Sequence, residues 1–308
     1  MTLFTGRANP GLANLVARRL DMPLGNIIVE DFPDGELHVE LGETVRGNDV
    51  YIIQPTSPPV AANVFELLLI SDACRRAGAA RVTAVTPYFG YARQDRNSSG
   101  RGPISAKVVA DMFAAANIDR VIVMDLHNPS IEGFFGPVLV HLTAIPVLAE
   151  AVLASRSSVI VSPDLGGVKI AQQFAAILGL PVAIIHKERI SGTSVTAHSI
   201  TGNVKGQRAL IVDDMVSTGA TIEAAASALI DAGCEQQITV AAVHGLLVGP
   251  AVDRLERLNL KRIYLTNSVP KTKAGILPLE EVDISFLLSD AIRRVYEGCT
   301  LDELVARV

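Results

Sequence analysis

The chain has 308 residues, enough for one large domain or two ordinary ones. Hydrophobic residues make up 49% of it and charged residues 19%, which argues against an intrinsically disordered chain. The net charge of -5 gives no general attraction to nucleic acid or to an anionic membrane. We therefore expect neither as a partner, and local groups must hold any anionic ligand.

The cysteines and the apolar segments indicate a cytoplasmic protein. Cys74, Cys234 and Cys299 are far apart and form no C-x-x-C pair, which favours a reducing compartment. The N-terminus lacks the basic stretch and apolar core of a signal peptide. Acidic residues such as Glu66 interrupt the most apolar segments before the ~18 residues that a membrane-spanning helix needs.

Short β-branched runs alternate along the chain with longer stretches rich in Ala and Leu. The runs predict strands over Val50–Ile53, Arg81–Thr86, Arg120–Met124, Ser158–Val161, Val182–Ile185, Ala209–Val212, Ile238–Val243 and Arg262–Leu265. The stretches predict helices over Asn63–Ala77, Ser105–Ala116, Val168–Leu178 and Thr221–Ala232. This alternation predicts an α/β fold with doubly wound, mainly parallel sheets, and the unbroken apolar runs predict strands covered on both faces.

The pattern occurs twice, which predicts two similar domains. Gly78–Val85 and Gly233–Val240 each read as a helix-ending glycine, a few further residues and a strand. We place the domains at 1–145 and 146–308. The last 15 or so residues, roughly, are candidates for packing back onto the first domain.

The most specific motif follows the predicted strand Ala209–Val212. Asp213 and Asp214 come first, and the Ser217–Thr221 loop then leads into a helix. Free N–H groups at a helix N-terminus bind phosphate, and the carboxylates can accept hydrogen bonds from sugar hydroxyls. This predicts a ribose 5-phosphate site. The alternative is an ordinary helix N-cap at Ser217 or Thr218, which leaves the two carboxylates unexplained.

Acidic residues also follow two other predicted strands. Asp125 and His127 form a D-x-H pair, and alternate positions of an extended chain face the same way. Together with Asp164, they are candidate ligands for Mg²⁺, partly through water. A helix-capping Asp beside a structural His is the alternative interpretation.

Basic clusters supply the positive charge that the chain as a whole lacks. Arg93–Arg96 follows the predicted strand Arg81–Thr86, and Lys187 and Arg189 follow the predicted strand Val182–Ile185. The stretch Ile190–Gly206 after them is polar and contains glycine, so we expect a mobile loop that closes over a polyphosphate. No G-x-x-x-x-G-K-[ST] or G-x-G-x-x-G motif occurs, which argues against P-loop kinases and Rossmann dehydrogenases.

With these segments in view, the chain resembles the ribose-phosphate diphosphokinase family, also called phosphoribosyl pyrophosphate (PRPP) synthetases. The matching segments run through nearly the whole length and are Phe32–Glu36, Gly42–Gln54, Pro87–Arg96, Pro103–Lys107, Val123–Phe135, Ser162–Gly167, His186–Arg189, Val212–Thr221 and His244–Pro250.

The resemblance implies transfer of the diphosphoryl group of ATP to O1 of ribose 5-phosphate. The products are AMP and PRPP, a precursor of nucleotides, histidine and tryptophan. It also implies a phosphoribosyltransferase-like fold, Mg²⁺ as cofactor, and a homo-oligomer that is a hexamer or a smaller even-numbered assembly.

The resemblance implies a role for each matching residue. It assigns adenine contact from a neighbouring subunit to Phe32, Asp34 and Glu36, and further ATP contacts to Arg93, Gln94 and Asp95. It assigns Mg²⁺ binding to His127 and Asp164, with Asp125 nearby, and charge stabilisation during transfer to Lys187 and Arg189. It assigns ribose 5-phosphate binding to Asp213, Asp214, Ser217, Thr218, Gly219, Ala220 and Thr221.

The chain departs from the phosphate-activated, ADP-inhibited class of this family. That class usually has Asp where this chain has Ser217, and Gly136–Leu142 lacks the acidic and amide residues expected beside its effector site. Thr44, Arg46 and Arg101 do match that site. We therefore expect weakened or altered ADP inhibition, with inorganic phosphate as a candidate activator.

Two other functions share part of this pattern. A phosphoribosyltransferase that consumes PRPP would have the Asp213–Thr221 loop, but it would leave Phe32–Glu36, Arg93–Arg96 and Asp125–His127 unexplained. A catalytically silent regulatory homologue would have lost catalytic groups, whereas Lys187 and the other groups named above are present.

Overall fold

The computed structural model describes residues 1–97, 100–190, 195–270 and 275–305, with the side chains of 187–190 and 195–198 also outside the description. Contacts divide the chain into two compact units. Unit 1 comprises Met1–Thr143, Ser268–Pro270 and the C-terminal segment from Ile284; unit 2 comprises Ala144–Asn267 and a segment that ends at Asp283.

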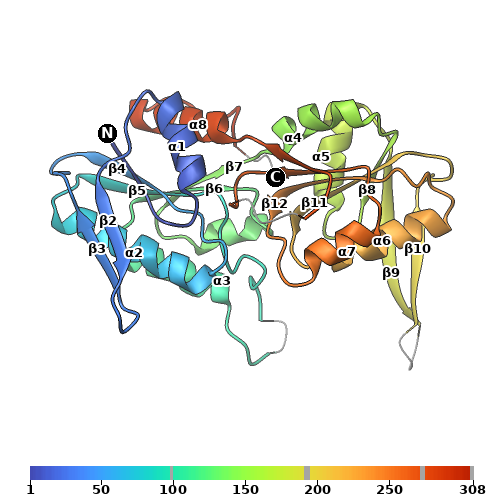
Figure 1. Cartoon of the computed structure of the whole chain (residues 1–308), viewed down its shortest axis with the longest axis horizontal. Helices are drawn as coiled ribbons and strands as arrows, with labels where there is room; N and C mark the ends of the chain where they lie inside the picture. The colour runs from blue at the N-terminus through green and yellow to red at the C-terminus, as the bar shows by residue number, and fades with distance from the viewer. Residues whose placement is uncertain (98–99, 191–194, 271–274, 306–308) are drawn as a thin grey trace. The chain divides into compact units, whose positions relative to one another are not determined.

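Unit 1 is built on a five-stranded parallel sheet of order β1-β4-β5-β6-β7. Its strands are β1 (Thr2–Thr5), β4 (Asp49–Ile53), β5 (Arg81–Thr86), β6 (Arg120–Met124) and β7 (Val138–Leu142). Helices α1 (Pro10–Arg19) and α8 (Ser285–Glu297) cover one face, and α2 (Val60–Arg76) and α3 (Ser105–Ala115) cover the other (Figure 1). A short 3-10 helix, η1 (Pro129–Phe134), follows β6, and the hairpin β2 (Ile27–Asp31)–β3 (Leu37–Leu41) packs against α2.

Unit 2 is built on a seven-stranded sheet of order β10-β9-β8-β11-β12-β13-β14, in which only β10 is antiparallel to its neighbour. The strands are β8 (Val159–Ser162), β9 (Val182–Ile190), β10 (Val195–Thr201), β11 (Ala209–Val216), β12 (Thr239–Gly245), β13 (Arg262–Thr266) and β14 (Leu279–Val282). Helices α4 (Ile145–Ala151), with the short η2 (Val152–Ser155) after it, and α5 (Val168–Leu178) lie on one face, and α6 (Ala220–Asp231) and α7 (Ala251–Arg257) on the other (Figure 1).

These two sheets confirm the α/β fold class with mainly parallel sheets. All five residues of β4 are buried, as are all seven of β12, because helices cover both faces of each strand. Local signals set the helix ends: Asn9 accepts a hydrogen bond from the backbone N–H of Leu12 at 3.2 Å and Pro10 occupies the first turn of α1. Gly179 ends α5 at φ +67°, where its N–H donates to the carbonyl of Ala175.

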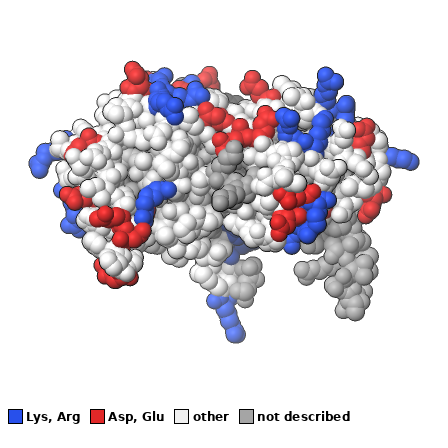
Figure 2. Space-filling view, viewed as in Figure 1, with Lys and Arg blue, Asp and Glu red and all other residues white. Residues whose placement is uncertain are grey.

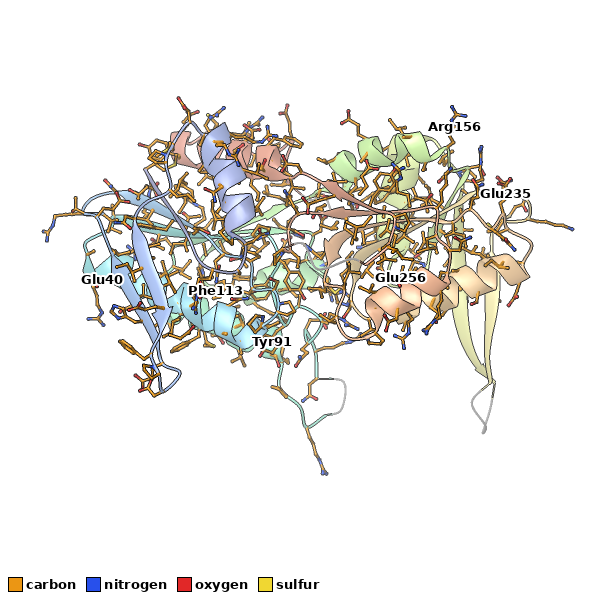
Figure 3. All side chains as sticks on the ribbon, viewed as in Figure 1. Glu40, Tyr91, Phe113, Arg156, Glu235 and Glu256 are labelled. Atoms are coloured by element: carbon orange, nitrogen blue, oxygen red, sulfur yellow. The ribbon has the colours of Figure 1, made fainter. Side chains whose placement is uncertain are left out.

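Phenylalanine replaces tryptophan as the large side chain of the unit 1 core. Phe113, labelled in Figure 3, has its ring centroid 5.8 Å from that of Phe89 and 6.3 Å from that of Phe135. The Phe89–Phe113 pair meets edge to face, which is a favourable arrangement of two aromatic rings. Aliphatic residues fill the core of unit 2.

We expected the polar stretch Ile190–Gly206 to be a loop, and that expectation is wrong for Ile190 and for Val195–Thr201, whereas residues 202–206 lie outside any strand. Strand β9 continues to Ile190, and β10 pairs antiparallel with it, from Val195 opposite Ile190 to Thr201 opposite Ile184. The β-branched residues in this stretch suit an edge strand. Residues 191–194 lie outside the described part of the chain.

On the face drawn in Figure 2, acidic and basic side chains are interspersed over both units. Within the described residues, no helix is both long and apolar enough to cross a membrane.

A row of buried polar groups crosses the unit 1 sheet. Tyr51, Thr83 and Arg120 are in register on β4, β5 and β6. The Tyr51 hydroxyl, Thr83 Oγ1 and Arg120 Nη1 are buried and have no hydrogen-bond partner in the described part of the chain. Burial, followed by the charge of Asp49, raises the pKa of the Tyr51 phenol. Such groups destabilise a fold because they lose their hydrogen bonds to water on folding and form none within the protein.

Two buried threonines allow this to be tested. Thr83 and Thr56 are both 0% exposed, but Thr56 Oγ1 accepts a hydrogen bond from the N–H of Gly90 at 2.6 Å and donates one to the carbonyl of Tyr88 at 3.2 Å. We expect Thr83→Val to raise the free energy of unfolding by about 1 kcal/mol and Thr56→Val to lower it by about 1–2 kcal/mol. Thermal unfolding of both variants measures this; a shift of the same sign in both would contradict it.

Candidate active site

Loops that carry polar residues gather at the carboxyl edge of the unit 2 sheet. Strands β8, β11 and β12 are parallel, so the residues that follow them emerge at one edge, where doubly wound sheets bind ligands. Residues 163–167 follow β8 and residues 217–219 follow β11. A Cβ added to Gly167 would lie 3.0 Å from Ser162 Oγ and 3.9 Å from Asp213 Oδ1, so the loop after β8 lies beside Asp213 of β11.

The segment from Asp213 to Gly219 differs from the expectation in two details. Strand β11 continues through Asp213 and Asp214 to Val216, because it pairs with β12 as far as Gly245. Helix α6 begins at Ala220, and Gly219 is its N-cap at φ +75° without a side-chain cap. The alternative interpretation of Ser217 or Thr218 as an ordinary N-cap is therefore wrong, and their hydroxyls are not used to begin the helix.

Backbone hydrogen bonds orient the peptide groups of this loop. The carbonyl of Val216 accepts from the N–H groups of Leu246 and Leu247 at 3.0 and 3.1 Å, and that of Ser217 accepts from Val248 at 3.0 Å. In a trans peptide the carbonyl and the following N–H point in opposite directions. The N–H groups of Ser217 and Thr218 therefore point away from the Leu246–Val248 segment. Neither has an acceptor among the described residues, so the loop presents free donors suited to an anion.

The carboxylates beside this loop lie close enough to repel one another. Asp214 is 6% exposed and Asp213 is half-buried, and Asp213 Oδ1 accepts a hydrogen bond from the N–H of Asp214 at 2.9 Å. Burial, and after it the charge of Asp214, raises the pKa of Asp213 well above its ordinary value, and the charge of Asp164 adds to this. A cation or the hydroxyls of a sugar would relieve the repulsion.

Asp164 is the exposed member of this group. Its Oδ1 accepts from the N–H groups of Gly166 and Gly167 at 2.8 and 3.1 Å, and its backbone carbonyl accepts from Ser162 Oγ at 2.7 Å. These bonds fix the carboxylate while its second oxygen has no partner in the described part of the chain. One fixed carboxylate oxygen is a suitable single ligand for Mg²⁺, which keeps most of its waters.

In unit 1, the predicted ATP-binding residues Arg93, Gln94 and Asp95 lie in the segment between β5 and α3. A turn through Gly90 sets their direction: a Cβ there would lie 2.6 Å from the carbonyl oxygen of Thr56, so only glycine fits. Gln94 Oε1 accepts from Ser105 Oγ at 2.7 Å, and Asp95 Oδ2 accepts from Asn128 Nδ2 at 2.6 Å. The structure thus joins Asp95 to the segment that follows β6, and Arg93 is exposed.

The extended geometry expected for Asp125 and His127 is absent. Strand β6 ends at Met124, and Asp125 has φ +38°, so the two side chains do not alternate as they would in a strand. Asp125 is 9% exposed and its Oδ1 accepts from Thr143 Oγ1 at 2.8 Å, whereas His127 is exposed. Within the described residues, no three His, Cys, Asp or Glu side chains are grouped so as to hold a metal ion.

His141 fixes the segment between Asp125 and His127, and sequence reasoning missed it. Its Nε2 accepts from the N–H of Leu126 at 2.9 Å, so its Nδ1 carries the proton and donates to Glu132 Oε1 at 2.6 Å. An imidazole near the end of the apolar strand β7 was the only signal in the sequence.

Phe32, Asp34 and Glu36 occupy the exposed tip of the β2–β3 hairpin. The N–H of Phe32 donates to the carbonyl of Glu36 at 2.7 Å, and the N–H of Glu36 donates to Asp34 Oδ1 at 3.0 Å. Phe32 is 45% exposed, and its ring centroid lies 5.3 Å from that of His38. An exposed aromatic ring beside two carboxylates suits contact with a planar base.

Arg7 ties this hairpin to the unit 1 core, which sequence reasoning also missed. Its Nη1 lies 2.7 Å from Asp31 Oδ2 beside the hairpin tip, and its Nε lies 2.7 Å from Glu66 Oε2. Glu66 is 2% exposed, and its Oε1 also accepts from Gln54 Nε2 at 3.0 Å. No local pattern shows these pairs because the partners are 24 and 59 residues from Arg7.

The roles predicted for two further groups of residues stay predictions. The backbones of Lys187 and Arg189 lie in β9, and their side chains lie outside the described residues. Thr44 and Arg46 are exposed where the chain enters β4, at the amino edge of the unit 1 sheet, whereas Arg101 follows β5 at its carboxyl edge. Within one chain the structure therefore does not bring the three residues of the predicted effector site together.

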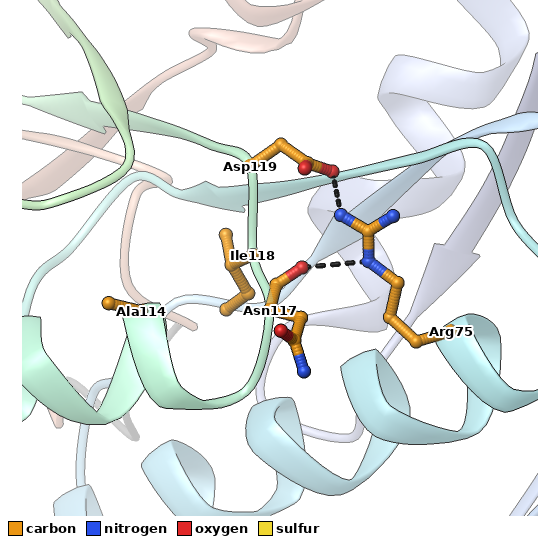
Figure 4. Close-up of a pocket in the computed structure, with 5 residues that line it drawn as sticks. All are labelled: Arg75, Ala114, Asn117, Ile118 and Asp119. Atoms are coloured by element: carbon orange, nitrogen blue, oxygen red, sulfur yellow. Dashed lines mark hydrogen bonds and ion pairs between the residues drawn. The ribbon is translucent and has the colours of Figure 1, made fainter.

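A cavity of about 450 Å³ lies at the amino edge of the unit 1 sheet, where Asp119 enters β6 (Figure 4). The guanidinium of Arg75 pairs with Asp119 and donates to the carbonyl of Asn117 at 2.8 Å. The charged groups of this cavity thus hold α2 to the segment that joins α3 to β6, at the edge of the unit 1 sheet opposite Arg93, Gln94 and Asp95.

The raised pKa of Asp213 predicts a pH-dependent stability. The folded chain binds this proton more tightly than the unfolded chain, so the stabilisation is complete below about pH 4 and is lost as the pH rises through the raised value. We expect Asp213→Asn to raise the melting temperature near pH 8 and the gain to vanish toward pH 4, roughly the ordinary carboxyl pKa. Melting curves of the variant and the parent from pH 4 to 8 measure this.

Asp31 gives a control of opposite sign, because its hydrogen bonds with Arg7 lower its pKa. Its stabilisation is present at neutral pH and is lost as the pH falls through the lowered value. Asp31→Asn should therefore lower the melting temperature at neutral pH, and the loss should shrink in acid. Equal pH dependence in both variants would contradict the account.

Known proteins match the chain along nearly its whole length, and two family models match parts of it. The N-terminal domain of ribose phosphate pyrophosphokinase matches residues 1–116, and the phosphoribosyl synthetase-associated domain matches residues 190–306. The ribose-phosphate pyrophosphokinase of Rhodopirellula baltica is 43% identical over 99% of this chain and 98% of the relative. That of Aquifex aeolicus is 40% identical over 98% of each.

A solved structure agrees with these sequence matches. The phosphoribosylpyrophosphate synthetase of Mycobacterium smegmatis has a TM-score of 0.91 and 37% identity, covering 96% of this chain and 99% of that one. The identity and the coverage are too high to reflect the fold alone. The chain belongs to the ribose-phosphate pyrophosphokinase family.

Proposed function

We propose that this chain transfers the diphosphoryl group of ATP to O1 of ribose 5-phosphate, giving AMP and PRPP. The observation that carries the proposal is the segment from Asp213 to Gly219, where two carboxylates precede a row of free N–H donors. The carboxylates suit the sugar hydroxyls and the donors suit the 5-phosphate. Membership of the family supports the same substrate and adds the nucleotide.

In the proposed reaction, O1 of the sugar attacks the β-phosphorus of ATP. A bond forms between O1 and that phosphorus, the bond from it to the oxygen shared with the α-phosphorus breaks, and AMP leaves with that oxygen. The proton of the O1 hydroxyl passes to solvent. Such transfers depend on in-line positioning and charge neutralisation more than on a strong base.

We assign the two substrates to the two units. Unit 2 binds ribose 5-phosphate through Asp213, Asp214 and the Ser217–Thr221 loop. Unit 1 binds ATP through Arg93, Gln94 and Asp95, and Lys187 and Arg189 of β9 stabilise charge on the transferring group. The hydrogen bond between Asp95 and Asn128 supports this assignment because it holds the segment after β5 beside that after β6, and Gln94 is fixed by Ser105 at the start of α3.

Mg²⁺ fits the oxygen-rich groups at these edges and would neutralise charge on the phosphates. Asp164 suits it best, since one oxygen of its fixed carboxylate has no partner in the described part of the chain. The exposed His127 is the second proposed ligand. Asp125 is buried and bonded to Thr143, so we assign it to orienting the segment that carries His127.

We propose a homo-oligomer with an even number of subunits, located in the cytoplasm. The exposed hairpin tip supports this, because Phe32, Asp34 and Glu36 stand out from unit 1 where a second copy can receive them. A subunit would then complete the nucleotide site of its neighbour. We further propose that Thr44 and Arg46 of one copy and Arg101 of another form any effector site.

Activity tests the proposal directly. Incubation with ATP, Mg²⁺ and ribose 5-phosphate should give equal amounts of AMP and PRPP, measured by chromatography or ³¹P NMR, and none without the sugar. The variant Lys187→Ala should lose turnover by about 10²–10³-fold while ribose 5-phosphate binding changes little. A phosphoribosyltransferase would instead consume added PRPP, and a silent homologue would bind both substrates without making AMP; either result would refute the proposal.

A further inference from the structure

Arg254 contacts the Ser217–Gly219 loop from helix α7. Its Nη1 donates to the carbonyl oxygen of Thr218 at 2.9 Å. Its Nε forms an ion pair with Glu223 Oε2, also at 2.9 Å, and Glu223 lies in the first turn of α6. The Arg254 side chain is 27% exposed and that of Glu223 is 38% exposed, so both are partly shielded from water.

This contact fixes the third peptide group of the loop. The carbonyls of Val216 and Ser217 are held by backbone N–H groups of Leu246–Val248, but the carbonyl of Thr218 is held by a side chain. Because carbonyl and N–H are antiparallel across a trans peptide, the Gly219 N–H points away from Arg254. It has no acceptor among the described residues, so it adds a third free donor to those of Ser217 and Thr218.

Helix α7 itself is fixed against the loop. Gly219 has φ +75°, and a Cβ on it would lie 3.4 Å from Leu255 Cγ and 3.5 Å from the carbonyl oxygen of Ala251. Leu255 is 1% exposed and Ala251 is 0% exposed. Since the backbone on both sides of the contact is packed, the guanidinium has a defined place from which to hold the carbonyl of Thr218.

The charge of Arg254 acts on the loop through this carbonyl. A guanidinium only donates hydrogen bonds, so Arg254 holds the carbonyl of Thr218 and not an N–H group. Because the donor is charged, it polarises the Thr218–Gly219 peptide and makes the Gly219 N–H a stronger donor. The ion pair with Glu223 holds the guanidinium in place. The phosphate-binding strength of the Gly219 N–H therefore depends on a residue of another helix.

We propose that Arg254 is a positioning residue for ribose 5-phosphate. It orients and polarises the Thr218–Gly219 peptide, and so sets the affinity of the loop for the 5-phosphate, without touching the substrate. This inference rests on the proposed function of the loop, and it adds the residue on which the affinity depends.

Arg257 provides a matched control on the same helix. Its Nη2 lies 4.0 Å from Glu223 Oε1, its side chain is 68% exposed, and it has no hydrogen bond to the loop in the described part of the chain. The Arg254→Gln and Arg257→Gln variants remove the same charge from α7. A general effect of net charge would be equal in both, whereas an effect through the carbonyl of Thr218 would appear only in Arg254→Gln.

Steady-state kinetics with each substrate varied in turn test the inference. We expect Arg254→Gln to raise the KM for ribose 5-phosphate about tenfold or more, because one charge-assisted hydrogen bond is lost. The KM for ATP and kcat should each change by less than about twofold. Arg257→Gln should change all three constants by less than about twofold. Arg254→Lys should recover part of the affinity, because an ammonium can reach one of the two partners.

Calorimetry of ribose 5-phosphate binding, without ATP, separates this inference from the proposed function. If the parent chain binds the sugar phosphate but makes no AMP, the proposed function fails, while the affinity ratio of the parent to Arg254→Gln still decides the inference. Equal affinities, or equal losses in both KM values and kcat, would overturn it. If Arg254→Gln does not fold, Arg254→Lys and Glu223→Gln replace it, and unchanged sugar affinity in both would overturn it.

Discussion

The candidate site depends on the direction of three consecutive peptide groups after β11. The carbonyls of Val216, Ser217 and Thr218 all accept hydrogen bonds from the β12–α7 side, so the three following N–H groups all point the other way. A row of free donors at the start of a helix binds an anion without a single cationic side chain in contact with it. This is how a chain with a net charge of -5 can hold a sugar phosphate.

Acidic residues have different surroundings in the two units. In unit 1, the buried Glu66 is paired with Arg7 and bonded to Gln54, so its charge supports the fold and holds the hairpin. In unit 2, Asp213 lies beside Asp214 and Asp164, and the pKa of Asp213 is raised first by burial and then by the charge of Asp214, with a further contribution from Asp164. The second arrangement destabilises the free chain and favours whatever cation or hydroxyl groups bind there.

The sequence predicted most of the central strands and the loop because their signals are local. Strands such as β4 and β12 are unbroken apolar runs, and the Asp213–Thr221 segment carries its chemistry in consecutive residues. Contacts between distant residues left no local pattern: Arg254 is 36 residues from Thr218. The prediction that Asp125 and His127 face the same way on an extended chain is wrong because Asp125 adopts φ +38°. The sequence does not reveal this conformation for an aspartate. The sequence did not predict the pairing of β9 with β10, because the polar residues of an edge strand give the same pattern as a loop.

The central claim is that the loop binds the 5-phosphate through backbone donors whose direction the β12–α7 side sets. A crystal structure with ribose 5-phosphate tests it most directly. The account predicts phosphate oxygens about 2.7–3.2 Å from the backbone nitrogens of Ser217, Thr218 and Gly219, with the carbonyl of Thr218 still bonded to Arg254. A phosphate bound elsewhere, or a Thr218–Gly219 peptide turned so that its carbonyl faces the ligand, would contradict it.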